Sequence, residues 1–127
     1  KQLETDAGNF QTRFSLRRPR LGCWWNWSPF VDKRQGRPKE YDAHHFVPWR
    51  HWRAQVARDI LDGWGIKIND IENGMWLERT FHRTLSNNHK YMRNVPRRLR
   101  KAKGSRSKVL KALDRIRDSL SNCEIPD

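Results

Sequence analysis

The sequence is poor in cysteine, in acidic residues and in long apolar runs. Two cysteines, Cys23 and Cys123, are too few for a zinc knuckle, which needs close cysteine pairs. Only 14 Asp and Glu residues accompany 27 Lys and Arg, which gives a formal charge of +13. A field of that sign attracts polyanions, and nucleic acid is the leading candidate ahead of an anionic membrane or an acidic protein.

The shortage of apolar runs and of cysteine bears on membrane insertion, on a secretory signal and on disulfide formation. No stretch approaches the roughly 18 uninterrupted apolar residues of a membrane-spanning helix, and the first residues lack the apolar region of a secretory signal. We favour free buried thiols for Cys23 and Cys123, with a single bridge between the two ends as the alternative in an oxidising compartment. Because the chain begins at Lys1 rather than Met, we expect a piece of a longer polypeptide.

The length of 127 residues, 35% of them hydrophobic, suits one domain. We expect a basic, tryptophan-containing extension at 1–40 that packs on the domain, a core at 41–99, and a basic C-terminal helix at 100–127 that belongs to the same domain. We expect the free protein to be a monomer.

The middle of the chain predicts a strand followed by a helix. Residues 41–47 suit a short strand, and Pro48 suits the first turn of a helix. This helix would end at Gly63 and Gly65. Its expected buried stripe has helical spacing and consists of Trp49, Trp52, Val56 and Ile60.

The remainder predicts a second strand and further helices, which together give an α+β fold. Ile66 and Ile68 alternate with polar residues, and a hairpin-like return through Asn73-Gly74 leads to a strand at 75–77. A helix follows Glu78 and is interrupted or restarted at Pro96. After Gly104, a final helix capped by Ser107 would bury Val109, Leu110, Leu113, Ile116 and Leu120.

His44, His45, Asn73 and His82 have an order and spacing that suit phosphodiester hydrolysis. This reaction needs a nucleophilic water and a cation, and imidazole can accept the proton or ligate the metal. Adjacent strand residues point to opposite sides, so one of the paired histidines would bind metal while the other faces the water. The Asn73 amide can hydrogen-bond an imidazole and hold one tautomer, and a ligand at position 86 would share the helix face of His82.

Several motifs follow one another over about residues 42–99. They are Ala43-His44-His45-Phe46-Val47-Pro48, Ala57 to Leu61, Gly65 to Asn69, Asn73-Gly74-Met75-Trp76-Leu77, His82 and Tyr91 to Val95. In this order they resemble the AHH subgroup of the HNH and endonuclease VII superfamily. The resemblance implies a β-β-α metal finger with His44 as a metal ligand, His45 as the general base, Asn73 as the residue that orients the base, and His82 as a second metal ligand.

The same resemblance implies a biological role. Members are typically C-terminal domains of bacterial polymorphic toxins that are secreted or delivered into a target bacterial cell and neutralised by a cognate immunity protein. We therefore expect a DNA endonuclease toxin with one divalent ion (Mg, Mn, Ni or Zn), an acidic immunity partner and action in the target cytoplasm. A ribonuclease toxin of the same fold is one alternative, and a non-catalytic basic binding module is another.

Ser86 departs from the family, which has a histidine at this position as a metal ligand. His89 lies seven residues after His82, which is about 10 Å along a helix and too far for both rings to reach one ion. Three explanations remain: an irregular backbone, water in place of the side chain, or a replacement that silences a lethal enzyme. We favour the last, so the chain is expected to be attenuated or inactive.

The remaining basic and aromatic residues have simpler expected roles. His51 is expected on the surface without a role. Most of the seven tryptophans are expected in the core, and only the cluster at 24–27 is a candidate binding surface. The candidate nucleic-acid contacts come from a run with no acid and from a nearby histidine, and they are Arg97, Arg98, Arg100, Lys101, Lys103 and His89.

Overall fold

The computed structural model describes residues 24–25, 40–86 and 88–127. Within them the elements are β1 (Trp24–Trp25), β2 (Tyr41–His45), η2 (Trp52–Ala54), α2 (Gln55–Gly63), η3 (Ile71–Asn73), β3 (Gly74–Glu78), α3 (Arg79–Leu85), α4 (His89–Ala102) and α5 (Arg106–Ser121), where η marks a short 3-10 helix. None of the described helices is long and apolar enough to cross a membrane.

The sheet has antiparallel strands in the order β1-β3-β2. In the β2–β3 register, Ala43 lies opposite Trp76 and His44 lies opposite Met75. Alternation along β2 places Asp42 and His44 on one face and His45 on the other. The alternation along this short strand therefore decides which titratable side chains share a face.

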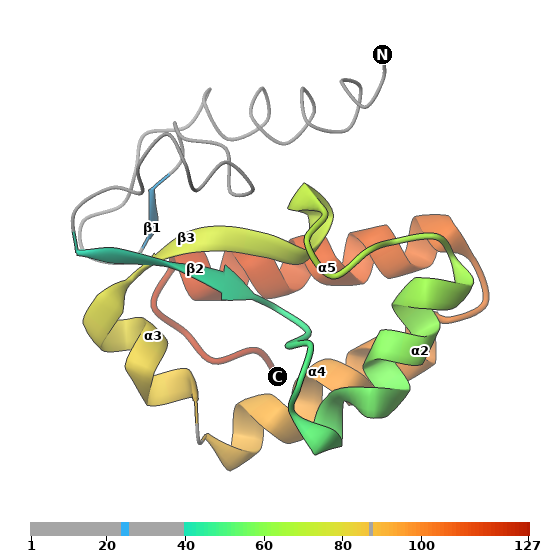
Figure 1. Ribbon diagram of the computed structural model, residues 1–127, viewed down its shortest axis with the longest axis horizontal. Helices are drawn as coiled ribbons and strands as arrows, with labels where there is room; N and C mark the ends of the chain where they lie inside the picture. Colours follow the sequence, from blue (N-terminus) through green and yellow to red (C-terminus); the bar gives the residue numbers. More distant parts are fainter. Residues whose placement is uncertain (1–23, 26–39, 87) are drawn as a thin grey trace.

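The helices surround this sheet in an α+β arrangement, which confirms the α+β part of the predicted fold class. Helix α5 runs behind β3, while α3, α4 and α2 follow one another around the opposite side, from the left through the bottom to the right of Figure 1. The enclosed core draws on every layer and includes Phe46, Leu61, Trp76, Leu77, Tyr91, Leu99, Leu113, Ile116 and Leu120.

Strand β3 passes into α3 without a loop. Glu78 is both the last residue of the strand and the N-cap of the helix, where its carboxylate accepts hydrogen bonds from the backbone N–H groups of Thr80 and Phe81, each at 2.9 Å. The same bonds hold the pKa of Glu78 below its ordinary value. This direct joint brings α3 beside β2, where His82 meets the face that carries Asp42 and His44.

The predicted buried stripe of the first helix is wrong. Helix α2 starts only at Gln55, and the side chain of His51 caps the short turn before it by accepting from the Arg53 N–H. The buried positions are those with small or branched side chains, Ala54, Ala57 and Leu61, because this face packs closely against α4. The expected stripe is instead mostly exposed at Trp49, Trp52 and Val56.

Three local boundaries also differ from the prediction. Ile66 and Ile68 do not form a hairpin strand. They lie in a loop in which the Asp70 carboxylate accepts a hydrogen bond from the Lys67 N–H at 2.8 Å, and β3 pairs with β2 instead. Pro96 lies inside α4, and the break comes earlier, where the Asn88 side chain caps the Tyr91 N–H. The cap of α5 is Ser105 rather than Ser107, which lies inside the helix.

Cys123 lies exposed after α5 and is disulfide-bonded, so the preferred prediction of a free buried thiol is wrong for this residue. Cys23 lies outside the described residues, as does most of the predicted extension at 1–40. The division of the chain into extension, core and C-terminal helix therefore stays a prediction.

Arg117 joins α5 to the turn that carries Asn73. The side chain is 2% exposed, and its Nη2 donates to the carbonyl oxygens of Ile71 and Gly74 at 3.0 and 3.2 Å. Its Nη1 donates to Asp114 at 2.7 Å, and the guanidinium lies 5.0 Å from the ring centroid of Phe46. A single buried cation thus supplies the hydrogen-bond donors for a turn next to the site.

We expect Arg117→Met to lower the free energy of unfolding by about 1–3 kcal/mol, because it leaves buried carbonyls without a donor. The comparison is Arg115→Met, which removes an exposed arginine from the same helix and is expected to change stability by less than about 0.5 kcal/mol. Urea denaturation measures both. Equal stability of the two variants would contradict the role given to Arg117.

Candidate active site

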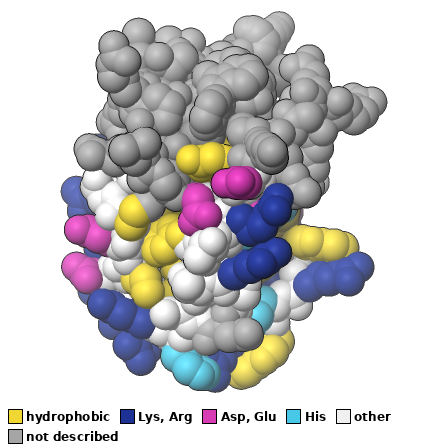
Figure 2. All heavy atoms as spheres, turned by 90° about the vertical axis from the view of Figure 1, so that its left-hand side faces the viewer, with side chains coloured by type: hydrophobic (Ala, Val, Ile, Leu, Met, Phe, Trp, Pro, Cys, Tyr) yellow, Lys and Arg dark blue, Asp and Glu magenta, His cyan; other side chains and the backbone are white. Residues whose placement is uncertain are grey.

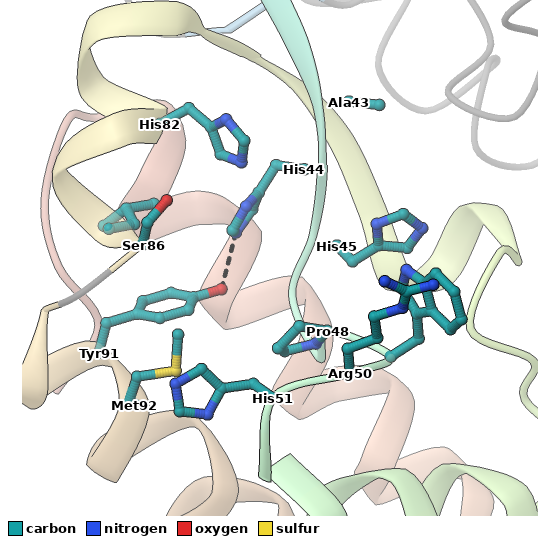
Figure 3. A pocket seen from close by; sticks show the side chains of 12 residues that line it. Ala43, His44, His45, Pro48, Arg50, His51, His82, Ser86, Tyr91 and Met92 are labelled. Carbon is teal, nitrogen blue, oxygen red and sulfur yellow. Dashed lines mark hydrogen bonds between the residues drawn. The ribbon is translucent and has the colours of Figure 1, made fainter. Parts of the chain in front are cut away.

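A pocket of about 320 Å³ opens where β2 ends, between the segment that follows β2 and the helices α3 and α4. Figure 3 shows its side chains gathered from these elements. They are Ala43, His44, His45, Pro48, Trp49, Arg50, His51, His82, Leu85, Ser86, Tyr91 and Met92.

His44 and His82 lie next to each other in this pocket (Figure 3). Their ring centroids are 5.0 Å apart and the rings are nearly perpendicular. His82 Nδ1 lies 3.1 Å from Oδ2 of Asp42, which shares its strand face with His44. The two histidines that sequence spacing singled out therefore converge.

Hydrogen bonds fix the tautomer of each ring. Tyr91 donates its only hydroxyl proton to the carbonyl oxygen of Phe46 at 3.0 Å, so the 2.7 Å contact with His44 Nε2 requires that nitrogen to donate. His82 Nδ1 likewise donates, because the carboxylate of Asp42 can only accept. The nitrogens that remain to offer a lone pair are consequently His44 Nδ1 and His82 Nε2.

The charges of the neighbouring groups support these assignments. Burial, helped by the nearby His82 and His45, holds the pKa of His44 well below 6.5, so its ring is neutral at neutral pH. Burial alone would raise the pKa of Asp42, but hydrogen bonds from His82 and Arg79 outweigh it and keep the pKa below its ordinary value. Burial raises the pKa of Tyr91, whose hydroxyl stays protonated.

The depressed pKa of His44 predicts acid sensitivity. Below about pH 6.5 the unfolded chain binds a proton at this ring and the folded site does not, so stability is lost as the pH falls from 6.5 toward the folded-state pKa. We expect His44→Gln to remove part of this loss, and His89→Gln, at an exposed position, to leave it in place. Urea midpoints between about pH 7.5 and 5.5, measured in EDTA, test this; the same pH slope in both variants would contradict it.

His45 points to the other side of β2 from His44, yet it borders the same pocket because the strand ends there (Figure 3). Its Nε2 lies 2.8 Å from the amide oxygen of Asn69, an acceptor, so Nε2 carries the proton. The lone pair of the neutral ring is then on Nδ1. The expected division of the histidine pair over two faces is what the geometry shows.

Asn73 does not hold the His45 ring as expected. It is fully buried, and its amide bonds the main chain: Oδ1 accepts from the Val47 N–H at 3.0 Å, and Nδ2 donates to the carbonyls of Val47 and Ile68. Its own carbonyl accepts from the Phe46 N–H. The amide is saturated by this backbone, so Asn73 fixes the two residues after His45, and the contact with the ring is made by Asn69.

Ser86 lies one turn after His82 and borders the same pocket. His89 belongs to the next helix, is exposed and contacts Arg53, so an irregular backbone does not bring it to His82. Among residues 24–25, 40–86 and 88–127, no three His, Cys, Asp or Glu side chains are gathered as a metal-binding group. The candidate ligands in the described site are therefore the adjacent imidazoles of His44 and His82 and the hydroxyl of Ser86.

The profile of the AHH family, a nuclease family of the HNH/endonuclease VII superfamily with conserved AHH, matches residues 30–124. The chain belongs to the AHH nuclease family. Comparison with curated proteins gave no match, and neither did comparison with solved structures. The match extends beyond residues 42–99 on both sides, so the AHH domain includes helix α5.

Two residues of the AHH site escaped the sequence interpretation. Asn69 lies in a segment that was expected to be a strand, and only its place in the Gly65 to Asn69 motif hinted at it. His51 was expected on the surface but borders the pocket, because the chain turns there before α2 begins. No periodicity in the sequence marks either position.

The predicted nucleic-acid contacts of the AHH domain divide over two faces of α4. Arg100 and His89 line a groove between α4, η2 and α2. Arg98 and Lys101 line a second groove, between α4 and α5, together with the α5 residues Lys108, Lys111 and Arg115. Arg97 and Lys103 are exposed. Figure 2 views the molecule from the left of Figure 1. It shows Lys and Arg side chains spread over this side of the molecule, with histidine side chains at its lower part.

Proposed function

We propose that this AHH domain is a divalent-metal-dependent endonuclease that hydrolyses DNA phosphodiesters. The observation that carries the proposal is the pair of adjacent imidazoles, His44 and His82, whose orientations are fixed by Tyr91 and Asp42 beside the ring of His45. In this proposal β2, β3 and α3 are the β-β-α metal finger of the superfamily.

The side chains fit a divalent ion. His44 and His82 would hold it through Nδ1 and Nε2, and their other nitrogens already have the carboxylate or hydroxyl partner that metal-bound histidines usually have. Ser86 and water would complete the coordination. When bound, such an ion neutralises charge on the phosphate and on the leaving oxygen. Imidazole ligands favour Ni or Zn, and Mg and Mn remain candidates for the working ion.

His45 is proposed as the general base. Its Nδ1 accepts a proton from the attacking water, whose oxygen then bonds to phosphorus as the bond to the leaving oxygen breaks. The hydrogen bond from Nε2 to the Asn69 oxygen strengthens when the ring becomes charged. Asn69 and Asn73 are positioning residues, one for the ring and the other for the backbone after it.

The basic surface supports substrate binding. Arg97, Arg98, Arg100, Lys101 and Lys103 are proposed to contact phosphates, together with His89. Contacts of this kind give affinity without reading bases, and binding weakens steeply with salt.

We also propose that the domain acts as a toxin in the cytoplasm of a target bacterium and that an acidic immunity protein neutralises it. The support is the family membership and the excess of positive charge. Loss of colony growth on cytoplasmic expression of a version that cuts DNA tests the toxin role.

The enzymatic proposal is tested by offering supercoiled DNA and structured RNA side by side, with each candidate metal and with EDTA. Nicking of DNA only with metal supports the proposal. Cleavage confined to RNA would assign the ribonuclease alternative. If no ion supports cleavage by this chain or by Ser86→His, the domain is a binding module.

A further inference from the structure

Two tryptophans beside the active-site pocket are strongly exposed: Trp49 by 58% and Trp52 by 74%. Burial of indole rings normally stabilises a fold, so exposed ones beside a pocket indicate a binding role. Each ring carries a guanidinium: Arg50 lies 4.2 Å from the ring centroid of Trp49, and Arg53 lies 5.1 Å from that of Trp52.

The exposed rings lie along a path that continues from the active site. Trp49 borders the active-site pocket, and Trp52 borders an adjoining groove of about 700 Å³ between η2, α2 and α4. Met92 lines both hollows, so the two adjoin at this residue. The lining residues include Arg53, Arg93 and Arg100, and no acidic residue is among those that the structure describes along this groove.

The flat aromatic faces and the arginines of this groove suit one ligand chemistry in particular. Nucleobases stack on indole and guanidinium planes, while phosphates pair with the arginines. In a duplex the base faces are covered by neighbouring base pairs, so only unpaired bases can stack on these rings. The surface is therefore matched to a strand whose bases are exposed.

We propose that Trp49 and Trp52 stack on unpaired bases of a nucleic-acid strand that runs through this groove, so that the domain prefers single-stranded or locally melted substrate. This inference rests on the proposed nuclease function and adds the substrate form. The groove holds the nucleotides that flank the one in the pocket, and its arginines follow their phosphates.

Binding is measured by fluorescence anisotropy in EDTA, with a labelled single strand and a labelled hairpin duplex at one salt concentration, because the phosphate contribution depends on salt. The unaltered protein is expected to bind the single strand more tightly. Trp49→Leu with Trp52→Leu should weaken single-strand binding by about 10-fold or more and duplex binding by less than about twofold. Trp49→Phe with Trp52→Phe should recover most of the loss, because phenylalanine keeps a stacking face.

Trp64→Leu serves as a matched control, since this tryptophan is also partly exposed but lies at the other end of α2. Equal weakening by the leucine and phenylalanine pairs would overturn the stacking role. Unchanged binding in the leucine pair would also overturn it and would assign the surface to a protein partner. Metal-dependent cutting of duplex without single-strand preference refutes only this inference, whereas absence of all binding and cutting refutes the proposed function.

Discussion

His45→Ala is expected to reduce metal-dependent DNA cleavage by about 10²- to 10⁴-fold while leaving cation affinity largely unchanged. The ring of His45 lies on the opposite side of β2 from His44, and its Nε2 bonds Asn69. Its removal therefore takes away the proton acceptor and does not touch His44 or His82. The measurements are initial rates of plasmid nicking and calorimetric titration with Mn²⁺.

The paired variant is His82→Ala, for which we expect the cation affinity and the cleavage to fall together. If cleavage proves too slow to quantify, both variants are made in the Ser86→His background. Loss of the cation in His45→Ala would exchange the roles of the adjacent histidines. Retained cation binding in His82→Ala would remove its role as a ligand.

Ser86→His is expected to raise cation affinity by at least about 10-fold and to raise cleavage with it. The expected size follows because loss of a partner outside the first coordination shell already changes affinity by about 10- to 100-fold. Residue 86 has helical backbone angles at the end of α3 and borders the same pocket as His82. A histidine there continues the helix face of His82 and supplies a third imidazole.

Ser86→Ala separates this effect from that of the serine hydroxyl. If the hydroxyl is a weak ligand, the alanine variant binds the cation less well than the unaltered chain. A histidine variant that binds no more tightly than the alanine variant would show that position 86 does not face the ion, and the account of an attenuated site would be wrong.

The sequence was most informative where local signals and long-range contacts agree. The strand at Tyr41, the strand before Glu78 and the last helix are confirmed in type. Short strands with paired registers place side chains predictably, so the approach of His44 and His82 could be anticipated from spacing and from the family resemblance.

The first helix shows why other features could not be predicted. Both the tryptophan stripe and the stripe of Ala54, Ala57 and Leu61 have helical spacing, and periodicity does not say which one packs inside. Close approach of α2 to α4 favours the alanines, and this depends on tertiary structure. The contact of Asn69 with His45 likewise joins two segments that meet only after folding.

The account depends most directly on where the cation binds. A crystal structure of the domain with Mn²⁺, with the ion located by anomalous scattering, measures this. We predict one ion at about 2.0–2.3 Å from His44 Nδ1 and His82 Nε2, with the His45 ring beside it and not bonded to it. An ion bound elsewhere, or one held by His45 while His44 and His82 keep apart from it, would contradict the proposed site.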